Sequence, residues 1–285
     1  MKDLWTHDVL PVPGSLWQLG QHRLLCGDAT DSSQCMQLFD KKKFSLCFTS
    51  PPYNQQRRYL CSPFNWHSLM CSSFDQIIAY GECDCHILIN LGLCHNNRRV
   101  NLYWLEWLSY CESIGWPLFG WYVWDQGSGL PGEWGGRLAP SHEFLFHFNQ
   151  KRKYPNKWQR TSGRIGGNKS LRNADGIVCQ ASSPHLFGQP FKIPDSVIRV
   201  NREYSRHSGE NHPAMFPIML PQYIMLSYSQ KNEIVYDPFC GSGTSILAAE
   251  NTGRICYAME IEPSYCKVAI RRWQKQTAQQ AIRLM

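Results

Sequence analysis

The fold class of this chain is decided by Asp237-Pro238-Phe239-Cys240-Gly241-Ser242-Gly243-Thr244, a glycine-rich stretch between two apolar segments. The apolar run at 233–236 predicts a strand before it, and residues 244–250 predict a helix directly after it. A second strand is predicted at 255–259, and it ends at Glu260. A strand, a glycine turn, a helix, a strand and an acid together predict a nucleotide-binding half of an open α/β sheet.

The residues of this turn favour one kind of nucleotide ligand over another. Gly241 and Gly243 allow the backbone to approach a ligand, and Glu260 can accept hydrogen bonds from ribose hydroxyls. The turn lacks the third glycine of the dinucleotide fingerprint, so a dehydrogenase is the weaker alternative. Asp237 at the strand end would repel a pyrophosphate, but it suits a cationic sulfonium ligand that carries an amino group. Charge therefore favours S-adenosylmethionine over NAD.

A second motif, Thr49-Ser50-Pro51-Pro52-Tyr53, follows the apolar run at 44–48. The pattern predicts a buried strand that opens into a rigid loop, because proline cannot extend the hydrogen-bond ladder. The Ser50 hydroxyl and the Pro51 carbonyl can accept from the exocyclic amine of a nucleobase, and Tyr53 can stack on a base taken out of the helix. Taken alone, the motif also fits an ordinary proline turn.

The length and net charge of the chain indicate which architectures and partners are compatible with both motifs. With 285 residues it can form one large α/β domain or a domain with an inserted lobe. Lysine and arginine number 29 against 22 acidic residues, a net charge of +7 that is compatible with a nucleic-acid partner. Further strands are predicted at 85–91, 119–124 and 144–148, and helices at 32–39, 65–80 and 101–114. This alternation favours a sheet with crossover helices.

A basic segment follows the predicted strand at 144–148. Between 151 and 172 it has no acidic residue, and its cations alternate with aromatic residues and glycines. They are Lys151, Arg152, Lys153, Lys157, Arg160, Arg164, Lys169 and Arg172. Spaced cations of this kind suit the phosphates of several nucleotides, so we expect a DNA-contacting insert that runs to about residue 206. A disordered basic loop without a partner is the alternative.

Two other features have a functional and a structural interpretation. The loop at 125–140 is rich in Gly, Trp and Pro, and such loops at strand ends form either ligand sites or packing flaps. The cluster Cys83, Cys85, His86, Cys94 and His95 raises the question of a zinc site. Because residues 85–91 read as a core strand and no paired C-x2-C spacing occurs, we expect no metal and interpret the thirteen cysteines mainly as buried free thiols.

The ends of the chain and its hydropathy suggest a location. Residues 1–14 show no signal-peptide pattern, and no apolar run reaches membrane-spanning length. We therefore expect a protein of the cytoplasm of a bacterial or phage-infected host cell, with no membrane partner.

Both motifs resemble those of the N4-cytosine/N6-adenine DNA methyltransferases. The stretch from Asp237 to Thr244 looks like their S-adenosylmethionine motif, and Ser50-Pro51-Pro52-Tyr53 looks like their target-amine motif. The order of target motif, basic insert and cofactor motif is similar to the permuted order of the β group. Weaker likenesses cover Cys26-Gly27-Asp28, Ser141-His142-Glu143-Phe144 and His212-Pro213 to Pro217; Gln55-Gln56-Arg57 and Trp124-Asp125-Gln126-Gly127 resemble phage-type members.

The resemblance implies a fold and a division of the chain. The fold is that of S-adenosylmethionine-dependent methyltransferases, α/β with a mostly parallel, doubly wound sheet, one antiparallel strand and a basic recognition insert. Residues 1–150 would form the catalytic half with the target-amine motif, 151–206 the target-recognition insert, and 207–285 the cofactor-binding half.

The resemblance also assigns roles to residues. The cofactor-binding set would be Asp28, Asp237, Phe239, Gly241, Gly243, Thr244 and Glu260. The catalytic set would be Ser50, Pro51, Pro52 and Tyr53. Double-stranded DNA would be bound by Arg57 and Arg58 together with the cations of the basic segment. His142 and Glu143 are left out of catalysis, because the family pattern is loose there.

The function implied is site-specific DNA methylation, as in restriction-modification systems, with S-adenosylmethionine as the cofactor. Ser50 stands where most adenine-directed members carry Asp, so we expect cytosine N4 as the target and keep adenine N6 as the alternative. Methylation of RNA or of a protein amide, and a catalytically silent DNA-binding protein with the same fold, are further alternatives. The motifs do not encode the oligomeric state, and a homodimer stays among the expectations.

Overall fold

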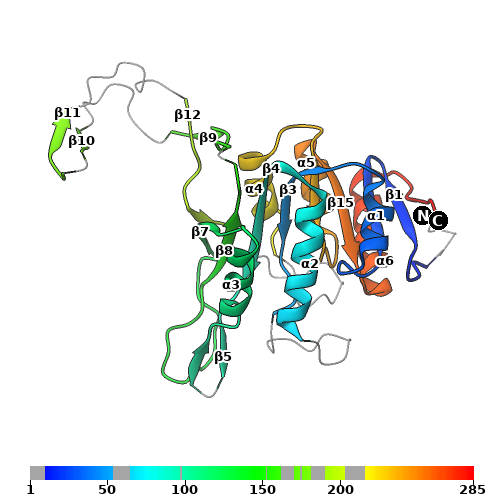
Figure 1. The fold of residues 1–285 in the computed structure, drawn as a ribbon, viewed down its shortest axis with the longest axis horizontal. Helices are drawn as coiled ribbons and strands as arrows, with labels where there is room; N and C mark the ends of the chain where they lie inside the picture. The colour runs from blue at the N-terminus through cyan, green and yellow to red at the C-terminus, as the bar shows by residue number, and fades with distance from the viewer. Residues whose placement is uncertain are drawn as a thin grey trace.

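The computed structural model describes residues 10–53, 65–96, 98–151, 153–161, 170–173, 175–180, 190–202 and 216–285. In this part of the chain a ten-stranded mixed sheet forms the centre of the molecule (Figure 1). From edge to edge the strands are β13 (Val197–Arg199), β7 (Leu118–Asp125), β8 (His142–Phe148), β4 (Gly81–Leu91), β3 (Phe44–Thr49), β14 (Ile234–Asp237), β15 (Ile255–Glu260), β2 (His22–Cys26), β1 (Leu16–Leu19) and β16 (Ile282–Arg283).

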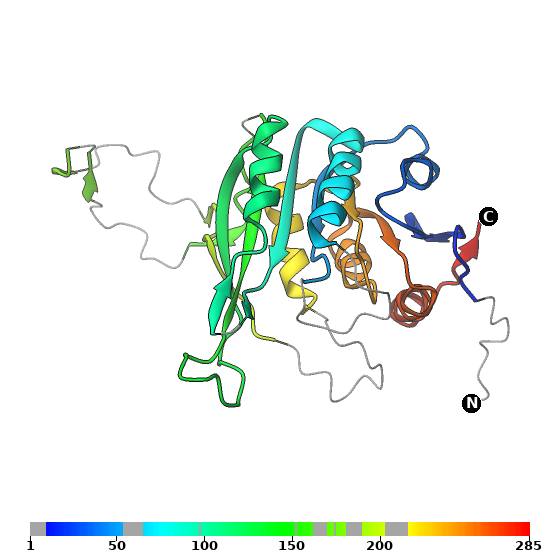
Figure 2. The same cartoon turned by 60° about the horizontal axis from the view of Figure 1, so that its bottom comes forward.

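Helices cover both faces of this sheet (Figures 1 and 2). One face packs against α1 (Ser32–Phe39), α2 (Trp66–Tyr80) and α3 (Leu105–Ser113). The other packs against α4 (Met219–Tyr228), α5 (Thr244–Thr252) and α6 (Pro263–Thr277). Strand β3 contributes Phe44 and Cys47 to the first core and Leu46 and Phe48 to the second. Burial on both faces explains its continuous apolar sequence.

The doubly wound, mostly parallel sheet is confirmed, but one detail of the expected topology was wrong. In the described chain two strands, not one, run against their neighbours. Strand β8 pairs antiparallel with β4 and β7, and β1 pairs antiparallel with β2 and β16. β1 and β2 are joined by a turn at Gly20 and Gln21, in which Gly20 has a φ of +58°. A two-residue hairpin of this kind requires antiparallel pairing.

The strand order brings the two sequence motifs together. β3, which precedes the Ser-Pro-Pro-Tyr stretch, pairs in parallel with β14, which precedes the glycine turn. Val235 lies opposite Leu46, and Tyr236 lies opposite Cys47. Because parallel neighbours end at the same edge of a sheet, both motifs begin at the carboxyl edge of adjacent central strands.

The basic segment leaves the sheet at the opposite edge. Strand β8 is antiparallel, so the chain after it starts from the edge at which the parallel strands begin. There, β9 (Gln159–Arg160) pairs with β12 (Phe191–Lys192), and the hairpin of β10 (Ser170–Arg172) and β11 (Val178–Gln180) projects outward (Figure 1). Strand β13 returns the chain to the sheet beside β7. The division at 150 and 206 stays a prediction.

The cysteines and the possible metal ligands are part of this framework. The cysteines whose side chains the structure describes are free thiols, and most of them are buried. The same segments contain no group of three or more His, Cys, Asp and Glu side chains placed to hold a metal. They also contain no helix that combines the length and apolarity needed to cross a bilayer.

Two buried histidines connect the central strands with α4. His86 Nδ1 lies 2.9 Å from His147 Nε2, and His147 Nδ1 lies 2.9 Å from the Tyr122 hydroxyl. Tyr122 and Tyr228 bring their hydroxyls to 3.1 Å. Burial lowers the pKa of His86 to about 4 and that of His147 to about 3.

This pair predicts acid sensitivity of the fold. A histidine with a depressed pKa in the folded protein contributes its stability above the pKa of about 6.5 that it has in the unfolded chain. This contribution is lost as the pH falls toward the pKa values of the folded protein. Each histidine should remove about 2 kcal/mol from the free energy of unfolding between pH 7 and pH 5. Denaturation at both pH values checks this. His147→Phe should reduce the loss, and the exposed His95→Phe should not; an equal pH response in both variants would contradict the assignment.

Candidate active site

The site begins with a contact between the two motifs. Thr49 Oγ1, at the end of β3, donates to Asp237 Oδ1, at the end of β14, at 2.7 Å. These residues lie 188 positions apart in the chain. Open α/β sheets bind ligands outside the carboxyl ends of their strands, so this contact marks the edge at which a site is expected.

Asp237 holds the start of the glycine turn by hydrogen bonds. Its side chain is completely buried, and besides Thr49 it accepts from the Ser245 hydroxyl and, at 3.2 Å, from the Phe239 amide. Burial raises the pKa of Asp237 to about 6, opposed by the hydrogen bonds from Ser245 and Thr49. In this conformation Asp237 positions the turn, and its direct contact with a cofactor stays a prediction.

The glycine turn is shaped by backbone conformation and by α6. Gly241 has a φ of +52° and Gly243 a φ of +80°, in the left-handed region that favours glycine. A Cβ on Gly243 would lie 2.7 Å from the Cβ of Ala269 in α6. Gly243 is therefore required for helix packing as well as for the turn, and it is the N-cap residue of α5.

Arg272 of α6 also forms hydrogen bonds with the glycine turn. Its Nη1 donates to the Ser242 carbonyl at 2.8 Å and to Thr244 Oγ1 at 3.1 Å. The Thr244 side chain is buried, so its hydroxyl is directed toward α6. Arg272 was not predicted from the sequence, because an amphipathic helix pattern does not show which cation points toward the glycine turn.

Glu260 and Asp28 lie on neighbouring strand ends. Glu260 ends β15 and accepts from the amides of Gly241 and Glu262, both at 2.9 Å. Burial raises the pKa of Glu260 to about 7. Gly27 donates its amide to the Glu260 carbonyl at 2.9 Å, which places Asp28 next to this acid. Each carboxylate oxygen of Glu260 retains a further lone pair that can accept from a hydroxyl.

The other predicted cofactor residues have mainly structural contacts. Asp28 Oδ1 accepts from the amide and the hydroxyl of Thr30, both at 2.8 Å. Phe239 is half-buried and packs against the core beneath α1, α2 and α3. The structure thus gathers the predicted cofactor set along one sheet edge, and direct ligand contacts stay predictions.

The residues of the target motif form a polar, hydrogen-bonded cluster beside this edge. The Tyr53 hydroxyl donates to Glu143 Oε2 at 2.6 Å and lies 3.3 Å from Ser50 Oγ. Asn90 Oδ1 is 3.2 Å from the same hydroxyl. The Pro52 carbonyl accepts from the indole nitrogen of Trp66 at 2.9 Å, and the side chain of Pro51 is buried. Ser50 therefore stands at the end of a hydrogen-bonded chain that terminates in a carboxylate.

Glu143 and Asn90 belong to this cluster and were not predicted from the sequence. Glu143 belongs to β8 and lies 90 positions from Tyr53. Burial, followed by the Glu143 carboxylate, raises the pKa of Tyr53 well above its usual value, which keeps the phenol protonated. The sequence signals were a carboxylate at the start of a predicted buried strand and the weak family likeness of Ser141-His142-Glu143-Phe144. The Tyr53 ring is only 6% exposed, so stacking of a base on it stays a prediction.

The structure describes only part of the predicted set of DNA-binding cations. Arg57, Arg58, Arg152, Arg164 and Lys169 lie outside the described residues, and Arg172 lies in the outlying strand β10.

The remaining cations belong to the basic segment, which leaves the sheet at its far edge. Lys151, Lys157 and Arg160 are exposed, whereas Lys153 Nζ forms an ion pair with Asp84 at 3.3 Å. Their DNA contact stays a prediction.

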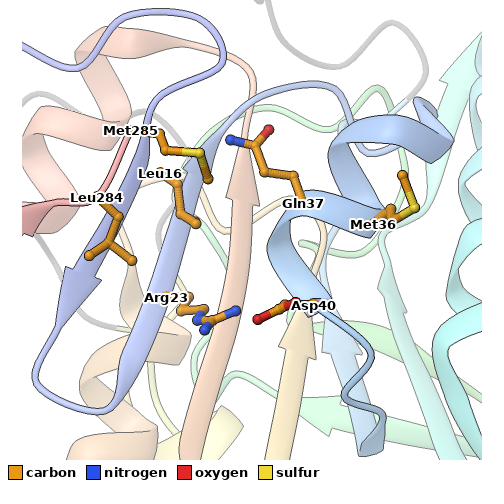
Figure 3. Close-up of a pocket in the computed structure, with 7 residues that line it drawn as sticks. All are labelled: Leu16, Arg23, Met36, Gln37, Asp40, Leu284 and Met285. Carbon is orange, nitrogen blue, oxygen red and sulfur yellow. The ribbon is translucent and has the colours of Figure 1, made fainter.

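A surface cavity of about 390 Å³ lies away from both motifs, between α1, the β1–β2 hairpin and the last residues (Figure 3). Its charged side chains, Arg23 and Asp40, point toward one another. Arg23 donates to the Leu38 carbonyl at 2.9 Å and lies over the Tyr257 ring. These contacts are those of packing, and we assign no chemistry to this cavity.

Comparison with known families identifies the family of this chain. The model of the DNA methylase family, the N6/N4 methyltransferases, matches residues 44–271. The chain belongs to this family. The match includes both the target motif and the glycine turn, and it confirms the expected family.

Relatives and solved structures agree with this assignment. The orphan methyltransferase M.BamHII of Bacillus amyloliquefaciens is 25% identical over 240 residues, 80% of this chain and 87% of its own. The cytosine-N4-specific PvuII DNA methyltransferase superposes with a TM-score of 0.61 at 18% identity, over 88% of this chain and 86% of that one. A DNA modification methylase of Thermus thermophilus, described as putative, was solved with S-adenosyl-L-methionine. It has a TM-score of 0.57 at 17% identity over 90% of this chain and 94% of that one. This DNA methylase therefore has the methyltransferase fold.

Proposed function

We propose that this DNA methylase transfers a methyl group from S-adenosylmethionine to the exocyclic amine of a base turned out of double-stranded DNA. The observation that carries the proposal is the hydrogen bond between Thr49 and Asp237, which joins the target loop to the cofactor turn at one sheet edge. Methyl donor and acceptor must meet at a single point, and orientation of two bound partners supplies much of the acceleration in such reactions.

The charges along the edge suit S-adenosylmethionine. Asp237, Glu260 and Asp28 make this region acidic, which favours a ligand with a sulfonium and an ammonium group over a pyrophosphate. Glu260 would hold the ribose hydroxyls, and the amides of the glycine turn at the start of α5 would face the ligand carboxylate. The bound cofactor supplies an electrophilic methyl group.

The residues of the target motif would prepare the amine for attack. The Ser50 hydroxyl and the Pro51 carbonyl accept from the amine and localise its lone pair. The nitrogen must lose a proton as it gains the methyl group. Ser50 can accept that proton and pass one through the Tyr53 hydroxyl to Glu143, because the oxygens are 3.3 Å and then 2.6 Å apart. No covalent intermediate on a cysteine is needed.

Cytosine N4 is the favoured target. Ser50 is a neutral acceptor and stands where most adenine-directed members carry a carboxylate. The family includes both N6 and N4 enzymes, so adenine N6 is the alternative. A homodimer is a separate expectation, which light scattering tests.

Cofactor affinity should depend on pH through Glu260. Burial raises the pKa of Glu260 in the folded protein to about 7. Its contribution to folding stability is therefore present below the pKa that it has in the unfolded chain, and it is lost as the pH rises through 7. Ribose hydroxyls bind the ionised form, so S-adenosylmethionine affinity should rise about tenfold from pH 6 to pH 8. Calorimetric titration measures this. Glu260→Gln should bind weakly with a flatter profile, and an unchanged profile in that variant would contradict the role.

The basic segment should contribute electrostatically to DNA affinity. Replacing Lys151, Lys157, Arg160 and Arg172 with Gln should lower the slope of log affinity against log salt by about 3 to 4, if each contacts a phosphate. Filter binding or anisotropy at several salt concentrations measures the slope. Replacing Lys41, Lys42 and Lys43, which are exposed near α1, should leave it unchanged. An unaltered slope in the first variant would remove the segment as a DNA contact.

The function is tested by transfer of label from [methyl-³H]S-adenosylmethionine to duplex DNA, RNA and protein in parallel. We expect label in duplex DNA. Label only in RNA or protein would contradict the proposal. A catalytically silent DNA-binding protein is distinguished by heat stabilisation, because it should show no shift with S-adenosylmethionine.

A further inference from the structure

The loop at 126–141, between β7 and β8, projects from the same sheet edge as the target motif. The loop ends at Ser141, two residues before Glu143, whose carboxylate accepts the hydrogen bond from the Tyr53 hydroxyl. The hairpin of β5 (Cys94–Asn96) and β6 (Arg99–Asn101) extends beyond the sheet in the same direction (Figures 1 and 2). Both projections therefore continue from β8 and β4, the strands that carry Glu143 and Asn90 beside Tyr53.

The loop is held in shape by its own hydrogen bonds. Gln126 donates its amide to the Ser141 carbonyl at 2.8 Å, which closes the base of the loop. The Trp134 indole donates to the Leu130 carbonyl at 3.0 Å, and the Arg137 amide donates to the Trp134 carbonyl at 3.2 Å. A loop with this many internal contacts can present a side chain at a defined position.

Leu138 is the side chain that this loop presents. It is 95% exposed, the highest value among the exposed large apolar side chains of the described residues. Its neighbour Arg137 is exposed, and so are Arg98 and Arg99 on the hairpin. An exposed apolar side chain next to one arginine, with two more arginines on the hairpin that projects in the same direction, matches a surface that is apolar inside and anionic outside. Stacked base pairs between two phosphate backbones have this pattern.

We propose that Leu138 enters the base stack of the DNA duplex and fills the gap left by the departing target base. The inference rests on the proposed function, because only an enzyme that turns a base out of the helix leaves such a gap. Apolar wedges of this kind are used by proteins that unstack DNA, and the three arginines would hold the phosphates on either side. Leu138 is thus a positioning residue that acts on the DNA and not on the reacting amine.

The test compares two forms of one substrate. The site that the wild-type protein methylates in plasmid DNA is mapped first, and oligonucleotide duplexes are made with the target base either paired or opposite an abasic position. The paired base must be extracted from its stack, whereas the unpaired base leaves with little resistance. Single-turnover methylation of both duplexes is measured for the wild type, Leu138→Ala and the control Met36→Ala. Met36 is 63% exposed on the distant helix α1.

Leu138→Ala should methylate the paired duplex about 10- to 100-fold more slowly than the wild type, because a buried leucine contributes that much to an equilibrium. Its rate on the unpaired duplex should stay within about twofold, and Met36→Ala should match the wild type on both. Fluorescence of 2-aminopurine at the target position should rise less with Leu138→Ala than with the wild type.

Two results would overturn the proposal for Leu138 and leave the proposed function intact. Equal slowing on paired and unpaired duplexes would make Leu138 a general contact, and an unchanged rate on the paired duplex would remove it from the DNA interface. In both cases the wild type still methylates DNA, so the proposed function stands. A wild-type protein that methylates no DNA would overturn the proposed function, and the wedge with it.

Discussion

Asp237→Ala should abolish S-adenosylmethionine binding and lower the free energy of unfolding by about 3 kcal/mol or more, because each buried donor left unpaired costs about 1–3 kcal/mol. The donors are the hydroxyls of Thr49 and Ser245 and the amide of Phe239. All three converge on a carboxylate with no exposed surface. Chemical denaturation measures the stability, and calorimetry on the folded fraction measures binding.

Asp237→Asn separates the two effects. The amide has the shape of the carboxylate, and one oxygen can still accept from Thr49 and Phe239, so most of the stability should return. The negative charge is lost, so cofactor affinity should stay well below that of the wild type. An Asp237→Ala protein with wild-type affinity would contradict the role of this turn, whatever its stability.

Tyr53→Ala should lower kcat by about 100- to 1000-fold, as does loss of one preorganised polar group in other active sites, while cofactor affinity is unchanged. Its ring and hydroxyl connect Ser50 with Glu143, so the variant removes both the base contact and the proton route. Stopped-flow or quench-flow methylation gives kcat, and calorimetry gives the cofactor affinity.

Two conservative variants separate proton transfer from base contact. Tyr53→Phe and Glu143→Gln each break the route, so each should lower kcat, and the double variant should be little worse than either single one. Tyr103→Phe is the matched control, because its hydroxyl donates to the Gly92 carbonyl at 3.0 Å and is not among the oxygens that join Ser50 to Glu143. Full activity of Tyr53→Ala would remove the tyrosine from the mechanism.

The central strands could be predicted because each has a local signal. The apolar runs of β3 and β14 are buried on both faces, and each ends at residues that cannot continue a strand, Pro51 and Pro238. The predicted helix after Asp31 is confirmed, with Asp31 capping the amides of Ser33 and Gln34. Gly253 ends α5 in a left-handed conformation, as a terminal glycine does.

The remaining site residues could not be found in this way, because their roles depend on contacts across the fold. Glu143 reaches Tyr53 only because β8 runs antiparallel beside β4, and a strand pattern does not reveal pairing direction. Arg272 reaches the glycine turn only because Ala269 packs against Gly243. The basic segment leaves the sheet at the far edge because β8, the strand before it, is antiparallel.

The central claim is methylation of an exocyclic amine in DNA, and mass spectrometry of nucleosides tests it most directly. Duplex DNA is incubated with the protein and S-adenosylmethionine, digested and scored separately for N4-methylcytosine and N6-methyladenine. We predict N4-methylcytosine. N6-methyladenine would retain the family assignment and contradict the argument from Ser50, and DNA of varied sequence that gains neither base would contradict the central claim.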